Sequence, residues 1–99
     1  MAAENRRWFA SSPATLSWRR WDDEFVFFDA SSGSTHLLDA AAGCVLIDLA
    51  AAPDGLDLRT LLGLNEAEFA DPATGAEIAA LQDVLTALQQ AGLAQSRSP

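Results

Sequence analysis

The spacing of apolar residues changes once along this chain, at Asp39, and the change separates a β half from a helical half. Before Asp39, apolar residues alternate with polar ones or gather in short runs of aromatic and β-branched residues, which is typical of strands. After Asp39, they recur at intervals of three and four residues, as on one face of a helix. Strands followed by helices indicate an α+β fold, in which helices pack on an antiparallel sheet.

Three strands are predicted in the first half. Residues 16–21 alternate, residues 24–28 form a short aromatic run between acidic residues, and residues 35–38 complete the set. An Asp-Asp pair joins the first two strands, and a serine-rich loop with Gly33, which adopts positive φ at no steric cost, joins the second to the third. Because residues 24–28 are apolar on both faces, we expect helices on one face of the sheet and the N-terminal arm over part of the other.

Three helices are predicted after the strands, so the fold class is α+β with a three-stranded antiparallel β-meander followed by three helices. Asp39 is a good N-cap for the first helix, over residues 39–51, because its carboxylate can accept hydrogen bonds from the free N–H groups of the first turn. Asp57 can cap a short second helix that stops near Gly63. The third and longest helix spans residues 77–91.

The remaining segments are predicted to be less regular. The acidic stretch 65–75 contains a proline and a glycine, and it is predicted to be a loop that can include one turn of helix. Residues 1–15 form a partly ordered N-terminal arm, residues 16–94 form one domain, and residues 95–99 form a frayed tail. With 99 residues, the chain has room for a single modest hydrophobic core.

The net charge of the chain indicates which classes of partner it can bind. The formal net charge is −8, and all six basic residues are arginines. Nucleic-acid-binding domains draw most of their affinity from Lys and Arg that neutralise phosphates, so this class of partner is disfavoured. The sequence has no apolar run long enough to span a bilayer and no apolar signal-peptide core, so a cytoplasmic protein is predicted. A homodimer is left open, because small sheets with free edges can exchange elements between chains.

Residues that carry enzyme chemistry are scarce. His36 is the only histidine and Cys44 the only cysteine, so neither a metal site nor a cofactor site is predicted. Cys44 lies in an apolar helical stretch and is interpreted as a small buried core thiol. Ser34, His36 and Asp39 are close in sequence, but Asp39 is better used as a helix cap, and a catalytic triad normally draws its members from separate elements. A protein without catalytic activity is therefore predicted.

Two features indicate an interaction surface instead. A three-stranded sheet has two edges, and an exposed edge is a template for an added peptide strand. The apolar arc of the last helix is also wide, about half of its surface at roughly 100° per residue. Leu81, Leu85 and Leu88 in this arc are more readily explained as core, whereas Val84 is the more open position.

The β half also carries a pattern that is found elsewhere. Residues 21–29 read Trp-Asp-Asp-Glu-Phe-Val-Phe-Phe-Asp and residues 32–38 read Ser-Gly-Ser-Thr-His-Leu-Leu. Apolar residues of the first helix follow at Val45, Leu46 and Leu49. This pattern resembles the PqqD-like family, in particular the branch called HPr-rel-A system PqqD family peptide chaperones. The resemblance covers residues 16–94 and includes the closing Leu85, Leu88, Gly92 and Leu93.

The resemblance implies a winged-helix-like domain that acts as the recognition element for ribosomally synthesised, modified peptides. Relatives bind the leader segment of a precursor peptide and present its core to a modifying enzyme, in this branch a kinase-like or nucleotidyltransferase-like protein. The leader adds as a strand to the third strand and lies in the groove beside the last helix. Carried over by position, the resemblance points to seven peptide-binding residues: Thr35, His36, Leu37, Leu38, Leu81, Val84 and Leu88.

Two other functions stay open at this point. The chain can be an interaction subunit that docks directly on a kinase-like or nucleotidyltransferase-like partner and has no peptide ligand. It can also be a DNA-binding winged helix, although residues 77–91 lack the arginine that a groove-reading helix needs. The peptide-chaperone hypothesis predicts that His36→Pro, which removes a donor from the third strand, weakens peptide binding without unfolding the protein.

Overall fold

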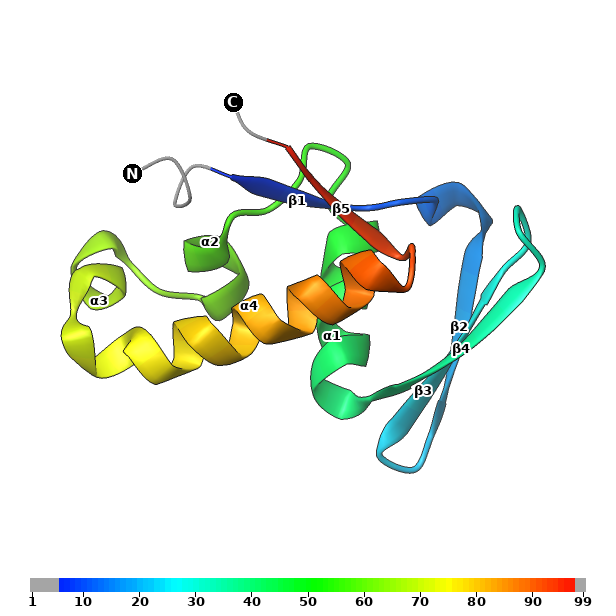
Figure 1. Cartoon of the computed structure of the whole chain (residues 1–99), viewed down its shortest axis with the longest axis horizontal. Helices are drawn as coiled ribbons and strands as arrows, with labels where there is room; N and C mark the ends of the chain where they lie inside the picture. Colours follow the sequence, from blue (N-terminus) through cyan, green and yellow to red (C-terminus); the bar gives the residue numbers. More distant parts are fainter. Residues whose placement is uncertain (1–5, 98–99) are drawn as a thin grey trace.

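A three-stranded antiparallel sheet stands at one end of the molecule, and the helices extend away from it (Figure 1). This arrangement is that of a computed structural model, which describes residues 6–97. The strands are β2 (Leu16–Trp21), β3 (Glu24–Asp29) and β4 (Ser34–Asp39), in the spatial order β2-β3-β4. The predicted α+β class and the predicted meander are confirmed, although β3 and β4 each extend slightly beyond the predicted bounds.

Both turns of the meander contain a residue with positive φ, as tight connections between antiparallel strands require. Asp22 has a φ of 56° in the turn between β2 and β3, a conformation that aspartate tolerates better than most residues. Gly33 has a φ of 73° in the loop between β3 and β4, as predicted from its position. The resulting register is continuous, and Phe27 in the central strand pairs with Trp18 on one side and His36 on the other.

The helices within the described residues are α1 (Ala40–Ala50), α2 (Leu58–Leu62), α3 (Glu66–Ala70) and α4 (Gly75–Gln90). Both predicted caps are confirmed. The carboxylate of Asp39 accepts a hydrogen bond from the N–H of Ala42 at 2.9 Å, and the carboxylate of Asp57 accepts one from the N–H of Thr60 at 2.8 Å. The longest helix, α4, has 16 residues, and no helix of residues 6–97 has both the length and the apolar character to cross a membrane.

Helix α3 lies in the segment predicted to be a loop with one turn of helix, and its five residues make that turn a fourth helix within the described residues. Its N-terminus is held by a reciprocal pair of hydrogen bonds. The Asn65 side chain accepts from the N–H of Glu68 at 2.8 Å, and the Glu68 carboxylate accepts from the N–H of Asn65 at 3.0 Å. This capping box satisfies two N–H groups that a helix of only five residues would otherwise leave free. A 3-10 turn, η3 (Pro72–Thr74), then leads into α4.

A second sheet pairs β1 (Arg7–Ala10) with β5 (Ala94–Arg97) in antiparallel fashion. The prediction of a frayed tail is therefore wrong as far as residue 97, because pairing with β1 supplies the order that the short polar sequence does not encode. Residues 1–5, 98 and 99 of the predicted arm and tail lie outside the described part of the chain.

Strand β1 is tied to the helical side of the molecule and does not lie on the outer side of the larger sheet. Trp8 exchanges two backbone hydrogen bonds with Leu56, at 2.8 and 3.0 Å, and packs in the core beside α1. The chain then passes through the 3-10 turn η2 (Pro13–Thr15) into β2. The expectation that the N-terminal arm covers part of the larger sheet is not met by residues 6–15, since these hydrogen bonds already hold β1 elsewhere.

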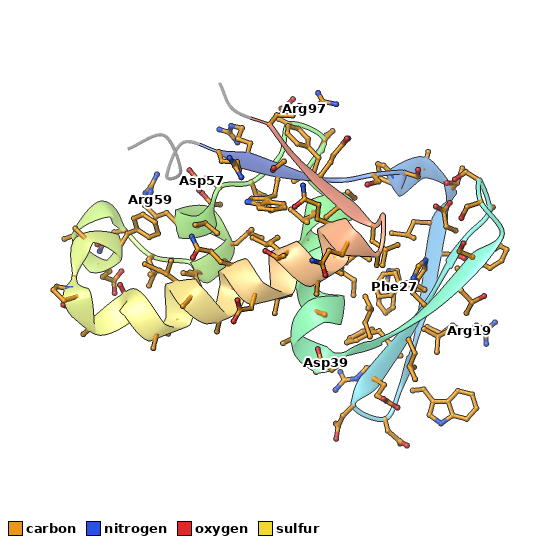
Figure 2. The ribbon with its side chains drawn as sticks, viewed as in Figure 1. Arg19, Phe27, Asp39, Asp57, Arg59 and Arg97 are labelled. Atoms are coloured by element: carbon orange, nitrogen blue, oxygen red, sulfur yellow. The ribbon has the colours of Figure 1, made fainter. Side chains whose placement is uncertain are left out.

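The core lies where the larger sheet meets α1 and α4, and its most fully buried side chains are all large and apolar: Phe27, Leu46, Leu49, Leu85 and Leu88. We call the side of the sheet that carries Phe25 and Phe27 its inner face, and the opposite side its outer face. Figure 2 shows Phe27 directed toward the helices and Arg19 directed to the other side. Alternation along each strand therefore sends one half of the side chains into the core and the other half to the outer face.

Helix α1 lies against the inner face through a narrow stripe of buried residues, Gly43, Leu46 and Leu49. Cys44 follows Gly43 and falls outside this stripe, where it is exposed, so the prediction of a buried core thiol is wrong. The physical reason is helix geometry. Gly43 faces the ring of Phe25, and the next residue along a helix projects about 100° away from that contact, so Cys44 points toward solvent.

Candidate functional site

The two edges of the larger sheet differ in how they are protected. Strand β2 forms one edge and carries Arg19 on the outer face and Arg20 on the inner face, where its guanidinium lies 5.8 Å from the centre of the Phe25 ring. Strand β4 forms the other edge, and residues 34–38 include no Lys, Arg, Asp, Glu or Pro. Charged residues on an edge strand discourage pairing with another chain. Asp39 at the end of β4 is charged, so the edge over residues 34–38 is the one that its own side chains leave open.

The register determines which backbone groups of β4 point away from the sheet. The N–H of Ala30 donates to the C=O of Thr15 at 3.0 Å, so this position bonds toward β2. The C=O of Asp29, one residue earlier, accepts from the N–H of Gly33 at 2.8 Å, on the side of β4. Successive residues of an antiparallel strand bond to opposite neighbours. Phe27 therefore bonds toward β4, as Asp29 does.

The same alternation continues onto β4. His36 and Leu38 lie opposite Phe27 and Phe25, so their N–H and C=O groups face β3. The N–H and C=O groups of Thr35 and Leu37 consequently face outward, away from β3. A strand added at this edge would form its hydrogen bonds with Thr35 and Leu37, and not with His36 and Leu38.

This geometry corrects the expected effect of a proline at His36. The N–H of His36 points into the sheet, so His36→Pro would break a ladder hydrogen bond to β3 and would not remove an outward donor. The sequence predicts that successive backbone N–H groups of β4 point to opposite sides, but it does not predict which residues point toward β3. That choice decides whether a proline at His36 removes an outward donor or a donor to β3. Thr35 and Leu37 are the positions at which proline removes an outward N–H.

The side chains of β4 divide between the two faces. Ser34, His36 and Leu38 are partly buried on the inner face, whereas Thr35, Leu37 and Asp39 are exposed on the outer face. Ser34 and His36 thus lie on the face opposite Asp39, whose carboxylate caps α1. The arrangement of these side chains does not form a triad.

The residues predicted on the last helix do not join those of β4 in one groove. Leu81 and Leu88 are only 6% and 1% exposed and lie in the core. Val84 is partly buried and packs against the edge of that core. Within residues 6–97, α1 is the helix that packs against β4, because β4 runs directly into it (Figure 1). The structure therefore brings Thr35, His36, Leu37 and Leu38 together on one edge, and it places Leu81 and Leu88 in the core against which Leu38 packs.

The outer face of the sheet carries apolar side chains that are not among the site residues predicted from the sequence. Trp21, Phe28 and Leu37 are 71%, 43% and 62% exposed. A hollow of about 400 Å³ on the β2 side of this face is lined by Ser17, Trp18, Arg19, Trp21, Val26 and Phe28. The alternation of Val26 and Phe28 with the buried Phe25 and Phe27 is the sequence signal that places them there.

Asp29 holds the start of the open edge in place. Its carboxylate accepts hydrogen bonds from the hydroxyl of Ser31 at 2.7 Å, the hydroxyl of Thr15 at 2.8 Å and the N–H of Ser31 at 3.0 Å. These hydrogen bonds from Ser31 and Thr15 favour the charged carboxylate and lower the pKa of Asp29 below its ordinary value. Because Asp29 pairs with Ser34, the network fixes the loop from which β4 begins.

The described part of the chain holds no group of three or more His, Cys, Asp or Glu side chains placed to bind a metal ion. Comparisons with protein-family models, with curated proteins and with solved structures found no match for this chain. The resemblance to the PqqD-like family therefore stays a prediction, and the functional argument rests on the geometry of the β4 edge.

Proposed function

We propose that this protein is a peptide chaperone, which binds the leader segment of a ribosomally synthesised precursor peptide by strand addition and presents it to a modifying enzyme. The observation that carries the proposal is the contrast between the two edges of the larger sheet. Arg19 and Arg20 protect β2, whereas β4 offers outward backbone groups at Thr35 and Leu37 with no charged side chain between them.

Strand addition is a known mode of peptide binding at an exposed sheet edge of this kind. Main-chain hydrogen bonds supply affinity, and the side chains beside the edge supply specificity. Each hydrogen bond contributes a net of about 0.5–1.5 kcal/mol, so the four outward groups of Thr35 and Leu37 give a modest affinity that neighbouring side-chain contacts must complete. A weak, reversible complex suits a carrier that must hand its peptide to another protein.

The role of a peptide chaperone also implies a partner enzyme and a cellular location. The protein would supply no reactive group of its own, and a kinase-like or nucleotidyltransferase-like protein would carry out the modification. The proposed location is the cytoplasm, where precursor peptides are made. The formal charge of −8 gives no support to the DNA-binding alternative.

The test is an NMR titration of the isotope-labelled full chain with synthetic leader segments of the short peptides encoded beside its gene. We expect shifts concentrated at the amides of residues 34–39, above all Thr35 and Leu37. Thr35→Pro should abolish these shifts because it removes an outward N–H, whereas Arg20→Pro, which removes an outward N–H at the other edge, should leave them intact. Shifts confined to β2 or to the helices would contradict strand addition at β4.

A second candidate function is direct docking on an enzyme without any peptide ligand. The hollow on the β2 side of the outer face favours it, because Trp21 is large, apolar and the most exposed of the hydrophobic side chains there. Trp21→Ser separates the two functions. A variant that keeps peptide shifts on β4 but loses its enzyme partner assigns the hollow to docking, and a native chain that binds the enzyme and none of the peptides favours docking alone.

A further inference from the structure

We infer that the peptide recognised at β4 is an amphipathic strand with the pattern basic–any–apolar, whose apolar side chain packs on Leu37 and whose Lys or Arg lies beside Asp39 and Glu24. The inference rests on the proposed strand addition and specifies its ligand. It follows from the backbone register, the exposure of the outer face and the distribution of charge at one end of β4.

The register decides which ligand side chains reach the outer face. Residues directly opposite each other in an antiparallel pair project to the same face of a sheet. Thr35, Leu37 and Asp39 project to the outer face of β4. Three alternate residues of an added strand, those opposite these positions, therefore project to the outer face as well. The intervening ligand residues project to the inner side, beside His36 and Leu38.

The middle one of these three positions is apolar because of its neighbours. Leu37 is directly opposite Val26 of β3, which covers it from one side only, and it stays 62% exposed. Phe28 lies diagonally across from Leu37 on the same face and is also exposed. An apolar side chain opposite Leu37 would cover Leu37 on the side away from β3. Val26, Leu37 and this side chain would then form one apolar row across the three strands. Removal of this apolar surface from water favours Val, Ile or Leu at that ligand position.

The position opposite Asp39 is basic because of the charges that surround it. Glu24 and Asp39 are directly opposite each other in β3 and β4, and both are exposed on the outer face. Like charges in such a pair destabilise a sheet. Asp22 and Asp23 in the adjoining turn add to the negative potential, and the capping bond to Ala42 holds the Asp39 carboxylate at this end. A Lys or Arg on the added strand is complementary to this group of charges.

The direction of the added strand sets the order of the two residues. The sheet β2-β3-β4 is antiparallel throughout, and an antiparallel ladder is slightly more stable per residue than a parallel one. β4 runs from Ser34 to Asp39, so an antiparallel ligand begins opposite Asp39 and continues toward Ser34. The basic residue therefore precedes the apolar residue by two positions. A parallel ligand would present the two in the reverse order.

The test is a selection of phage-displayed random dodecapeptides on the full chain, followed by affinity measurements on synthetic peptides. We expect the selected peptides to contain Lys or Arg two residues before Val, Ile or Leu. A representative peptide and its Glu-for-Lys counterpart should differ about tenfold in Kd, and Glu24→Gln should reduce that ratio. Leu37→Ser should weaken the representative peptide about tenfold, an effect equivalent to about 1.4 kcal/mol. Gln90→Ser, at an exposed position of α4, is the control and should leave the Kd unchanged.

The outcomes separate this inference from the proposed function. Peptides that shift the β4 amides but carry the reverse order, acidic residues or no pattern would overturn the inference and leave strand addition standing. An affinity that is unchanged by both Leu37→Ser and Glu24→Gln would overturn it as well. If no selected or gene-adjacent peptide shifts the β4 amides, strand addition itself fails, and the inference fails with it.

Discussion

Gly43 of α1 lies against the ring of Phe25 in β3 so closely that no larger residue fits there. A Cβ atom at Gly43 would be 2.6 Å from Cγ of Phe25, well inside the normal contact distance of carbon atoms. The helix that continues from β4 is thereby held close to the inner face of its own sheet. This contact packs the helix that follows β4 directly against the central strand β3.

Gly43→Ala should therefore destabilise the fold. Alanine in place of glycine normally stabilises a helix by about 0.5–1 kcal/mol. Here the added methyl group must displace the Phe25 ring, and overpacking of a core typically costs about 1–3 kcal/mol, so we expect a lower free energy of unfolding. Urea denaturation followed by circular dichroism measures this change.

Gly75→Ala is the matched control, because Gly75 begins α4 in helical conformation and its Cβ would contact nothing. It should be as stable as the native chain or slightly more so. Equal stability of the Gly43 and Gly75 variants would show that the Phe25 contact yields without cost.

Proline substitutions along β4 should alternate in their effect on stability. His36→Pro removes an N–H that faces β3 and leaves the C=O of Phe27 without its donor, which costs about 1–3 kcal/mol in a buried ladder. Thr35→Pro removes an outward N–H and should be less destabilising. Thermal unfolding of the two variants gives the ranking. The reverse ranking would mean that the phase of the ladder is opposite to the one inferred from Ala30 and Asp29.

The hydrogen bonds to Asp29 predict how stability responds to acid. They lower the pKa of this carboxylate in the folded chain, so their contribution is full above the unfolded value of about 4 and is lost as pH falls through the lower, folded value. Asp29→Asn should be less stable than the native chain at neutral pH, and the difference should shrink below about pH 4. Thermal unfolding across this range measures it.

Asp48→Asn removes an equal charge from the exposed side of α1 and serves as the control for Asp29→Asn. A stability difference for Asp29→Asn that stays constant down to the lowest pH would show that the charged form of Asp29 does not support the hairpin loop.

Two tryptophans that look alike in the sequence should differ sharply when truncated. Trp8 is 7% exposed and packs in the core, so Trp8→Ala should lower the free energy of unfolding by about 3–5 kcal/mol. Trp21 is exposed on the outer face, so Trp21→Ala should change stability by about 0.5 kcal/mol or less. Chemical denaturation of both variants is the measurement, and a similar loss in the two would contradict the assignment of β1 to the core.

The parts of the fold that local chemistry encodes were predictable. The Asp-Asp turn, Gly33 and the caps at Asp39 and Asp57 all act within a few residues, and each is present in the structure. The capping box of Asn65 and Glu68 is an equally local signal, and it indicates the start of α3. Strand β5 is different, because Ala-Gln-Ser-Arg has no strand pattern and gains its structure from pairing with β1.

The site was predictable only in outline. The sequence placed residues 35–38 on an edge strand, but the phase of its hydrogen bonds depends on how the neighbouring hairpins close. The three α4 residues were expected beside β4, yet α1 packs there, and the packing of helices on a sheet depends on contacts such as Gly43 with Phe25. Exposure of Cys44 has the same origin, since one glycine shifts the buried stripe of α1 away from it.

The pairing of β1 with β5 joins residues that are ninety positions apart, Arg7 and Arg97. A ribosome makes a chain from its N-terminus at about 5–20 residues per second, so β1 is made several seconds or more before its partner β5. Trp8 gains its backbone partner when Leu56 has been made, but Phe9 has no strand to pair with until β5 follows, although the larger sheet and α1 can already form. During synthesis, this apolar N-terminal strand is therefore the part of the protein left open to folding chaperones, proteases and neighbouring nascent chains.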